Sequence, residues 1–179
     1  SPTGVTRTWQ LHTGTETEIV IIDTPAGVTG GQLIELFHRA DSILIPILPS
    51  IVDFYAVEQF LDELLRLAKH RIKDKRLGMI ANRVRMTSKS YAGIENLAEQ
   101  SGIPLIASLR DTQNYPRAMA SGLGVSDLKT NMAGKDHKQW KPIIEWLYEK
   151  IPSETKKNVH TSGGDSTGWN RSVASVAPS

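Results

Sequence analysis

An acidic residue at the end of an apolar run is the feature of this 179-residue chain that most clearly could do chemistry. The run from Ile19 to Gly31 reads I-V-I-I-D-T-P-A-G-V-T-G-G, so Asp23 follows four aliphatic residues and precedes a proline and three glycines. A carboxylate at the tip of a buried strand can hold Mg²⁺ through water, because Mg²⁺ prefers oxygen ligands and keeps several of its waters. Glycines let backbone N–H groups approach a phosphate and lead it to a helix N-terminus. The segment therefore predicts a site for magnesium and a nucleotide γ-phosphate.

Asp23 alone also has a purely structural interpretation, as the start of an Asx-turn before Thr24 and Pro25. The glycines that follow favour the phosphate interpretation. The sequence contains no G-x-x-x-x-G-K-[ST] loop, which in many nucleotide-binding proteins cradles the phosphates. Since that loop positions and neutralises the transferring phosphoryl group, we expect no meaningful ATP hydrolysis by this chain alone.

Short apolar runs alternate with amphipathic helical patterns along the chain, which predicts an α/β fold with a parallel sheet. The expected strands are Ile19–Ile22, Ser42–Leu48, Leu77–Ala81 and Pro104–Ala107. The expected helices are Gln32–Arg39, Asp53–Ala68, Tyr91–Gln100 and a final stripe from Trp140 to Ile151, with Pro142 in its first turn.

Polar residues follow each expected strand, and in parallel α/β sheets ligands bind outside the carboxyl ends of the strands. Besides Asp23, these residues are Pro49-Ser50, Asn82-Arg83 and Leu109-Arg110-Asp111. Asparagine offers a donor and an acceptor that suit the edge of a base, and an arginine plane can stack on a base. The structural alternative for Asn82 and Arg83 is a strand-end turn with a solvated arginine.

Three of these segments together resemble the ParA/MinD family of partition and positioning ATPases, which are P-loop NTPases with a deviant Walker A loop. The matching strings are V-I-I-D-T-P-A-G, L-I-P-I-L-P-S-x-x-D and A-N-R-V, and the resemblance extends from Ile19 to about Leu128. It implies a three-layer P-loop NTPase-like sandwich that is N-terminally incomplete here, because the family's first strand and its K-G-G-x-G-K-[ST] loop lie upstream of the matched region.

The resemblance also implies roles for individual residues and the cofactors ATP and magnesium. Asp23 corresponds to the Walker B and switch II carboxylate, which binds magnesium through water. The other nucleotide-binding residues that it implies are Pro25 and Gly27 near the phosphates, Asn82 and Arg83 at the adenine, and Arg110 and Asp111 near the base. A guanine site commonly requires [NT]-K-x-D, whereas no acid follows Asn82 within A-N-R-V-R, so adenine is favoured.

The function implied is that of a ParA-like ATPase of plasmid or DNA partition, or of cargo positioning. Its implied partners are a second copy of the chain, DNA bound without sequence preference, and a ParB-like adaptor. Two alternatives stay open: a non-catalytic binding module derived from such a protein, and another ATP-dependent enzyme of the same superfamily.

Basic residues form two groups with different expected roles. Lys69, Arg71, Lys73, Lys75 and Arg76 should lie at the rim opposite the ligand site, where a solvated loop is the favoured interpretation. The second group should lie nearer the nucleotide, where a dimer face could gather its members: Arg83, Arg85, Lys89, Arg110 and Arg117.

The amino-acid composition limits which classes of function are possible. The net charge is only +2, so attraction to DNA requires local clusters, and the absence of cysteine excludes disulfides, thiolate nucleophiles and zinc–thiolate sites. No apolar run approaches the roughly 18 residues of a membrane span, so we expect a cytoplasmic protein, nucleoid-associated if it binds DNA. We expect an irregular leader (1–17), one α/β nucleotide-binding domain (18–151) and a flexible, disordered tail rich in Ser, Thr and Gly (152–179).

Overall fold

The computed structural model describes residues 19–25, 27–68, 75–149 and 172–176. Five parallel strands form one sheet in the order β1-β5-β2-β3-β4. They are β1 (Ile19–Asp23), β2 (Ser42–Ile47), β3 (Arg76–Val84), β4 (Leu105–Arg110) and β5 (Ser172–Val176). The helices are α1 (Gly30–Arg39), α2 (Ile51–Ala68), α3 (Lys89–Ser101), α4 (Asn114–Ala120) and α5 (Thr130–Tyr148), with a 3-10 turn, η2 (Val125–Asp127).

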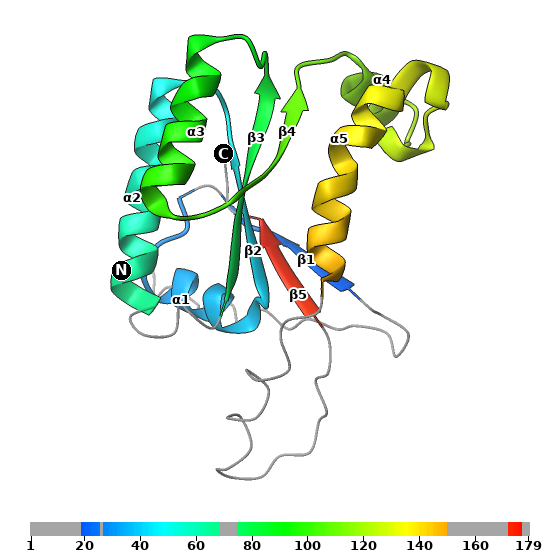
Figure 1. The fold of residues 1–179 in the computed structure, drawn as a ribbon. Coiled ribbons are helices and arrows are strands. Elements are labelled where there is room, and N and C mark those ends of the chain that lie inside the picture. The colour runs from blue at the N-terminus through cyan, green and yellow to red at the C-terminus, as the bar shows by residue number, and fades with distance from the viewer. Residues whose placement is uncertain (1–18, 26, 69–74, 150–171, 177–179) are drawn as a thin grey trace, which may run out of the picture.

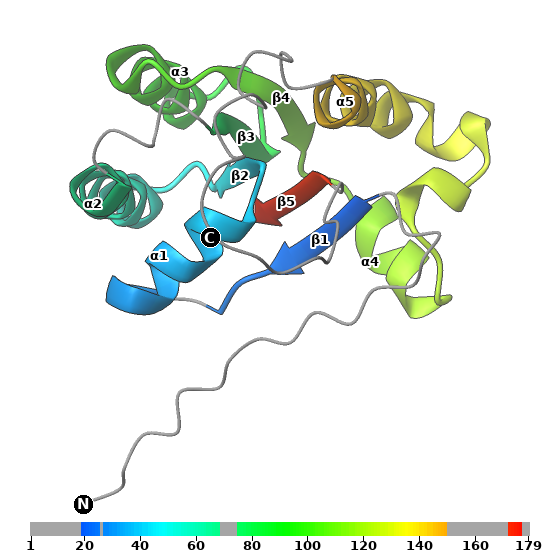
Figure 2. The same ribbon diagram turned by 90° about the horizontal axis from the view of Figure 1, so that it is seen from below.

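Helices cover both faces of the sheet (Figures 1 and 2), so the predicted three-layer α/β sandwich is confirmed. The larger core lies between the sheet and the layer of α1, α2 and α3, where Phe37, Ile45, Leu64, Met79 and Ile94 are fully buried. Because β2 is covered on both faces, it is a nearly continuous apolar run and not an alternating one.

A smaller core lies on the opposite face, under α5. Leu44 and Ile80 pack there with Ile143 of α5, and Trp140 and Trp146 close the cluster. Leu44 and Ile80 each neighbour a residue of the larger core in sequence, since successive strand residues point to opposite faces. The expectation that the C-terminal apolar stripe packs on the sheet is therefore confirmed for Trp140, Ile143 and Leu147, whereas Ile144 is 48% exposed and Ile151 lies outside the described residues.

Several element boundaries differ from those expected. Strand β4 continues to Arg110, so that Leu109 and Arg110 lie inside the strand and not after it. Strand β3 continues to Val84, so that Asn82 and Arg83 lie inside the strand and not after it. Helix α5 begins at Thr130, which places Pro142 in its interior and not in its first turn. An interior proline removes a helical hydrogen bond at a cost of about 3 kcal/mol, and the burial of Ala133 and Ile143 on either side helps to offset it.

Part of the segment expected to be a flexible tail forms strand β5, inserted between β1 and β2. Its sequence, S-V-A-S-V, is short and contains two serines, so it gave little strand signal. The expected leader (1–17) and the rest of the expected tail lie outside the described residues. Within the part of the chain that the structure describes, no helix combines the length and apolar character required to cross a membrane.

Candidate functional site

Asp23 is the last residue of β1, at the edge of the sheet where the parallel strands end. Its side chain is exposed. Magnesium is commonly bound through one or two carboxylates, with waters and nucleotide oxygens completing the shell. A single accessible carboxylate at a strand end fits this pattern. Among the described residues, no three His, Asp or Glu side chains converge to form a closed metal cage.

The loop after β1 contains two glycines in left-handed conformations. Gly27 has φ of 74° and Gly30 has φ of 57°, and a Cβ at either position would meet no atom within 4 Å. The backbone conformation, and not lack of space, therefore requires glycine here. Gly27, four residues after Asp23 in the sequence, is exposed.

The N-terminus of α1 already has an anionic partner. Thr29, its N-cap residue, makes no side-chain cap, and the Gly30 N–H instead donates to Oε1 of Glu63 in α2 at 2.8 Å. The Gly30 N–H at the start of α1 is therefore already paired with a carboxylate, although this helix N-terminus was the expected place for a phosphate. Any phosphate near Asp23 must use other backbone groups of the loop.

Asn82 and Arg83 form an irregular step in β3. The register with β4 shifts between Ala81 and Val84, and Arg83 has φ of 53°. Among the described residues it is the one non-glycine residue with positive φ. Such a conformation is unfavourable for a residue with a Cβ, and irregular strand steps commonly redirect side chains at binding sites.

Asp111 fixes the end of β4 to this step. Its N–H donates to the Val84 carbonyl oxygen at 3.3 Å, and its Oδ1 lies 3.6 Å from Nε of Arg83. Arg83 and Asp111 are both exposed, so their ion pair contributes little to stability. The structure thus brings Asn82, Arg83 and Asp111 together at one place on the rim.

Arg110 points elsewhere, into a polar cluster under α5. Its Nε and Nη2 donate to the two carboxylate oxygens of Asp136, at 2.6 and 3.0 Å. Asp136 is fully buried and also accepts from Nδ2 of Asn114 at 2.7 Å. The hydrogen bonds from Arg110 hold the pKa of Asp136 below its usual range, although burial opposes this. Gln139 completes the cluster by accepting from the Arg110 N–H at 3.1 Å.

Asp136 had no place among the predicted functional residues. It lies in the polar stretch A-G-K-D-H-K-Q, which carries no apolar periodicity. The signal that could have found it is its spacing of four residues before Trp140 and seven before Ile143, which places it on the buried face of the same helix.

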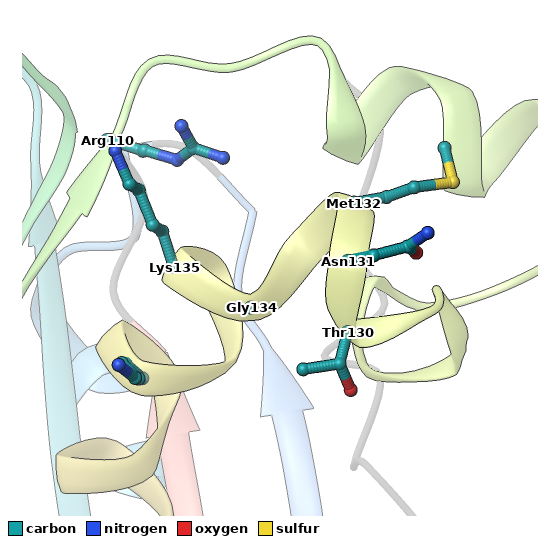
Figure 3. Close-up of a pocket in the computed structure, with 7 residues that line it drawn as sticks. Arg110, Thr130, Asn131, Met132, Gly134 and Lys135 are labelled. Carbon is teal, nitrogen blue, oxygen red and sulfur yellow. The ribbon is translucent and has the colours of Figure 1, made fainter.

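A pocket of about 480 Å³ lies beside the first turns of α5 (Figure 3). The residues that line it are Arg110, Thr130, Asn131, Met132, Gly134, Lys135 and Lys138. Neither Asp23 nor the Asn82–Arg83 step lines it. The Arg110 guanidinium is committed to Asp136, and the two lysines are exposed, so we assign the candidate nucleotide site to the rim and not to this pocket.

Asp23 and Asn82 lie at different levels along the sheet. The strand registers place Asp23 level with Val176, Leu44 and Gly78, so Asn82 lies four residues further along β3. Two strands, β5 and β2, separate β1 from β3, so these residues are about 14 Å apart across the sheet and about 13 Å apart along it at the usual strand spacings. The structure therefore places both residues toward the carboxyl ends of their strands but does not bring them together.

No protein-family model matches the chain. Over 137 residues, 76% of its length, the chain is 26% identical to "Maintenance of carboxysome distribution protein A" of Halothiobacillus neapolitanus. The chain spans 61% of the length of that relative.

Proposed function

We propose that this chain is the Walker B portion of a ParA-like ATPase that positions a large cellular cargo. The observation that carries the proposal is the exposed Asp23 at the carboxyl end of β1, in the same parallel sheet as the irregular Asn82–Arg83 step near the carboxyl end of β3. Similarity to a protein named for carboxysome distribution supports cargo positioning more than plasmid partition. Plasmid partition with a ParB-like adaptor is the second candidate within the same class.

Each residue of the rim has a distinct role in this proposal. Asp23 would hold magnesium through water, and the Gly27 backbone would contact the γ-phosphate. Asn82 hydrogen-bonds the adenine edge, Arg83 stacks on the base, and Asp111 orients Arg83. Bound magnesium would neutralise charge on the β- and γ-phosphates.

Arg110, one of the residues predicted to lie near the base, acts indirectly in this proposal. Its guanidinium is held by Asp136, so it fixes the end of β4 and thereby the position of Asp111. The phosphate-binding loop absent from this sequence would have to come from another segment for hydrolysis to occur.

A non-catalytic binding module is the alternative that a specific observation favours. Glu63 occupies the Gly30 amide, and a carboxylate beside the phosphate end opposes an anionic ligand. Magnesium-dependent nucleotide binding discriminates between the two functions, because a module that has lost nucleotide chemistry would bind none.

The test is binding of a fluorescent ATP analogue with and without magnesium. We expect magnesium to strengthen binding, and Asp23→Ala to remove roughly tenfold in affinity, equivalent to about 1.4 kcal/mol. Asp62→Ala is the matched control, since Asp62 is an exposed carboxylate on α2 with no proposed role. Unchanged magnesium-dependent binding in Asp23→Ala would sink the Walker B assignment. The same pair of variants, placed in a longer polypeptide with a phosphate loop, should differ in ATP turnover.

Self-association is part of the proposal and has a candidate surface. Ile51, Val52 and Tyr55 at the start of α2 are 68%, 73% and 61% exposed, and they lie next to the rim at which β2 ends. Sedimentation velocity of Val52→Glu against the unmodified chain, with magnesium and ATP, tests whether this surface joins two copies. A cytoplasmic, nucleoid-associated location is likewise proposed, and depends on the DNA binding argued in the Discussion.

A further inference from the structure

The pocket beside the first turns of α5 collects positive charge (Figure 3). Three cations line it: Arg110 at the end of β4, and Lys135 and Lys138 on α5. Figure 3 shows the Lys135 side chain extending from the helix toward Arg110. Neither lysine forms an ion pair with a described residue, whereas Lys141, the next lysine along the helix, pairs with Glu145. The pocket therefore has an excess of positive charge.

Arg110 is held in place by the buried carboxylate of Asp136, which accepts from its Nε and Nη2 at 2.6 and 3.0 Å. Asp136 also accepts from Asn114, so its oxygens are used inside the protein. Nη1 of Arg110 has no acceptor among the described residues, and the side chain is 33% exposed. One edge of the guanidinium is thus fixed and the other is available to a ligand. A side chain fixed in this way loses little conformational entropy on binding.

The charge and the lining of the pocket indicate the chemistry of its ligand. Asp136 neutralises one of the three cations, so the cluster has a net charge of +2. A phosphate monoester carries about −1.5 to −2 charges at pH 7 and offers three acceptor oxygens. Thr130 and Asn131 also line the pocket, and their side chains can hydrogen-bond hydroxyl groups. The volume of about 480 Å³ is typical of small-molecule sites and leaves room beside a phosphate.

We propose that this pocket binds a small hydroxylated molecule that carries a phosphate monoester, such as a sugar phosphate. The phosphate would receive charge-assisted hydrogen bonds from the three cations. The hydroxyl groups would contact Thr130 and Asn131. This site is separate from the proposed nucleotide site, because Asp23 and the Asn82–Arg83 step do not line the pocket.

The test is an NMR titration of the full, isotope-labelled chain with ribose 5-phosphate, without magnesium or ATP. We expect amide shifts that saturate and that are largest at Arg110 and in residues 130–138. Lys135→Gln combined with Lys138→Gln should raise the dissociation constant roughly tenfold or more, because hydrogen bonds from two charged groups are lost. The matched control is Lys141→Gln, which removes an exposed cation of the same helix outside the pocket and should leave the dissociation constant unchanged.

A second variant tests the shape of the site without changing its charge. Gly134 lines the pocket, and the nearest atom to an added Cβ is Cγ2 of Thr130, another lining residue, at 3.4 Å. Gly134→Leu therefore places an apolar side chain in the pocket and should weaken binding of ribose 5-phosphate as strongly as the double substitution does. Circular dichroism of each variant verifies that it folds.

Inorganic phosphate is the second probe, because it shares the charge of the ester but lacks the hydroxylated part. We expect it to bind more weakly than ribose 5-phosphate. Binding of inorganic phosphate as tight as that of ribose 5-phosphate would overturn the assignment to a phosphate ester.

Three further outcomes would overturn the proposal: no saturable shifts, an equal loss of affinity in Lys141→Gln, or unchanged binding in Gly134→Leu. The last would show that the anion lies on an open cationic surface, as the backbone of a nucleic acid would. None of these outcomes bears on the proposed nucleotide site, because magnesium and ATP are absent. Asp23→Ala should bind ribose 5-phosphate as the unmodified chain does, while it loses magnesium-dependent binding of ATP.

Discussion

Arg83 has an energetically unfavourable backbone conformation, although it has a direct role in the proposed site. A positive φ is unfavourable for arginine, and the ion pair with Asp111 is too exposed to compensate. Strained backbone that local contacts do not explain is concentrated at binding sites. This makes the Asn82–Arg83 step the better defined half of the rim.

Replacing Arg83 with glycine separates strain from function. Glycine adopts positive φ at no steric cost, so Arg83→Gly should leave the free energy of unfolding unchanged or raise it by up to about 1 kcal/mol. The same variant should weaken binding of the fluorescent ATP analogue, because the stacking plane is lost. Arg85→Gly is the control, since Arg85 is exposed and has no positive φ. If both variants bind nucleotide as the unmodified chain does, Arg83 has no part in the site.

Asp136 is the residue on which the end of β4 depends. It is fully buried and accepts hydrogen bonds from two nitrogens of Arg110 and one of Asn114, so its removal takes the acceptor from all three. Asp136→Asn should lower the free energy of unfolding by roughly 3 kcal/mol near pH 7. This value is at the low end of the range for breaking a buried ion pair, because the Arg110 side chain is partly exposed. Glu145→Gln on the same helix removes only an exposed pair with Lys141 and should cost a few tenths of a kcal/mol, about what such pairs contribute.

The pH dependence of this effect has a definite sign. The pKa of Asp136 is lower in the folded chain than in the unfolded one, so its stabilisation is present above the ordinary pKa of about 3.9 and is lost as the pH falls through the folded value. Urea unfolding should therefore show a constant difference between the unmodified chain and Asp136→Asn above about pH 5, and a shrinking one below about pH 4. A difference as large at pH 3 as at pH 7 would contradict this account.

Among the elements, those with strong apolar periodicity were predictable and those that use polar or small residues were not. Strand β2 and helix α2 follow their apolar patterns closely. The first half of α5 was missed because its buried positions are Ala133 and Asp136, which a search for apolar periodicity barely counts. Helix α4 was missed because it is seven residues long and contains a proline.

Two helical glycines should respond to alanine in opposite ways. Gly134 in α5 has room, because the nearest atom to an added Cβ is Cγ2 of Thr130 at 3.4 Å. Gly134→Ala should stabilise the chain by about 0.5–1 kcal/mol through helix propensity. Gly93 in α3 faces the Phe54 ring, whose Cε2 would lie 2.8 Å from the Cβ. Gly93→Ala should therefore destabilise by about 1–3 kcal/mol, as overpacking does.

The free energies of unfolding of the two variants, measured by heat or urea, test this prediction. Each variant is the control for the other. Equal gains in both would show that α2 and α3 can separate without cost at Phe54. Equal losses would show that Gly134 is held in place by contacts other than the helix itself.

For the whole molecule, the α/β sandwich could be predicted from the pattern of strands and helices, but the strand order could not. Nothing in the sequence near β1 and β2 reveals that they are separated by one strand position, because pairing partners distant in sequence leave no local signal. The same holds for Glu63, whose contact with Gly30 joins residues 33 positions apart. Both features bear on the proposed site, one by filling the position next to Asp23 and the other by placing a carboxylate near it.

The distribution of charge over the molecule limits which surface could bind DNA. The net charge is +2, so binding must use a local cluster. Arg76 is committed to Glu149, at 2.9 Å, and to the Trp146 ring, at 4.3 Å, while residues 69–74 lie outside the described part of the chain. At the other rim, Arg85, Lys89 and Arg117 are exposed.

We therefore expect DNA to bind at the rim formed by the ends of β3 and β4. Fluorescence anisotropy with a labelled duplex should show affinity that falls steeply with salt, and the slope should decrease by about 0.9 for each phosphate contact removed. We expect the slope to decrease in each of three rim variants: Arg85→Ala, Lys89→Ala and Arg117→Ala. Lys141 is an exposed cation on α5 that pairs with Glu145, and its replacement by alanine should leave the slope unchanged. A flat salt response of the unmodified chain would remove DNA from its partners. If Lys141→Ala reduces the slope as much as the rim variants do, DNA binds to diffuse surface charge. A localised DNA site would make the rim variants differ from a variant of an equally exposed cation elsewhere.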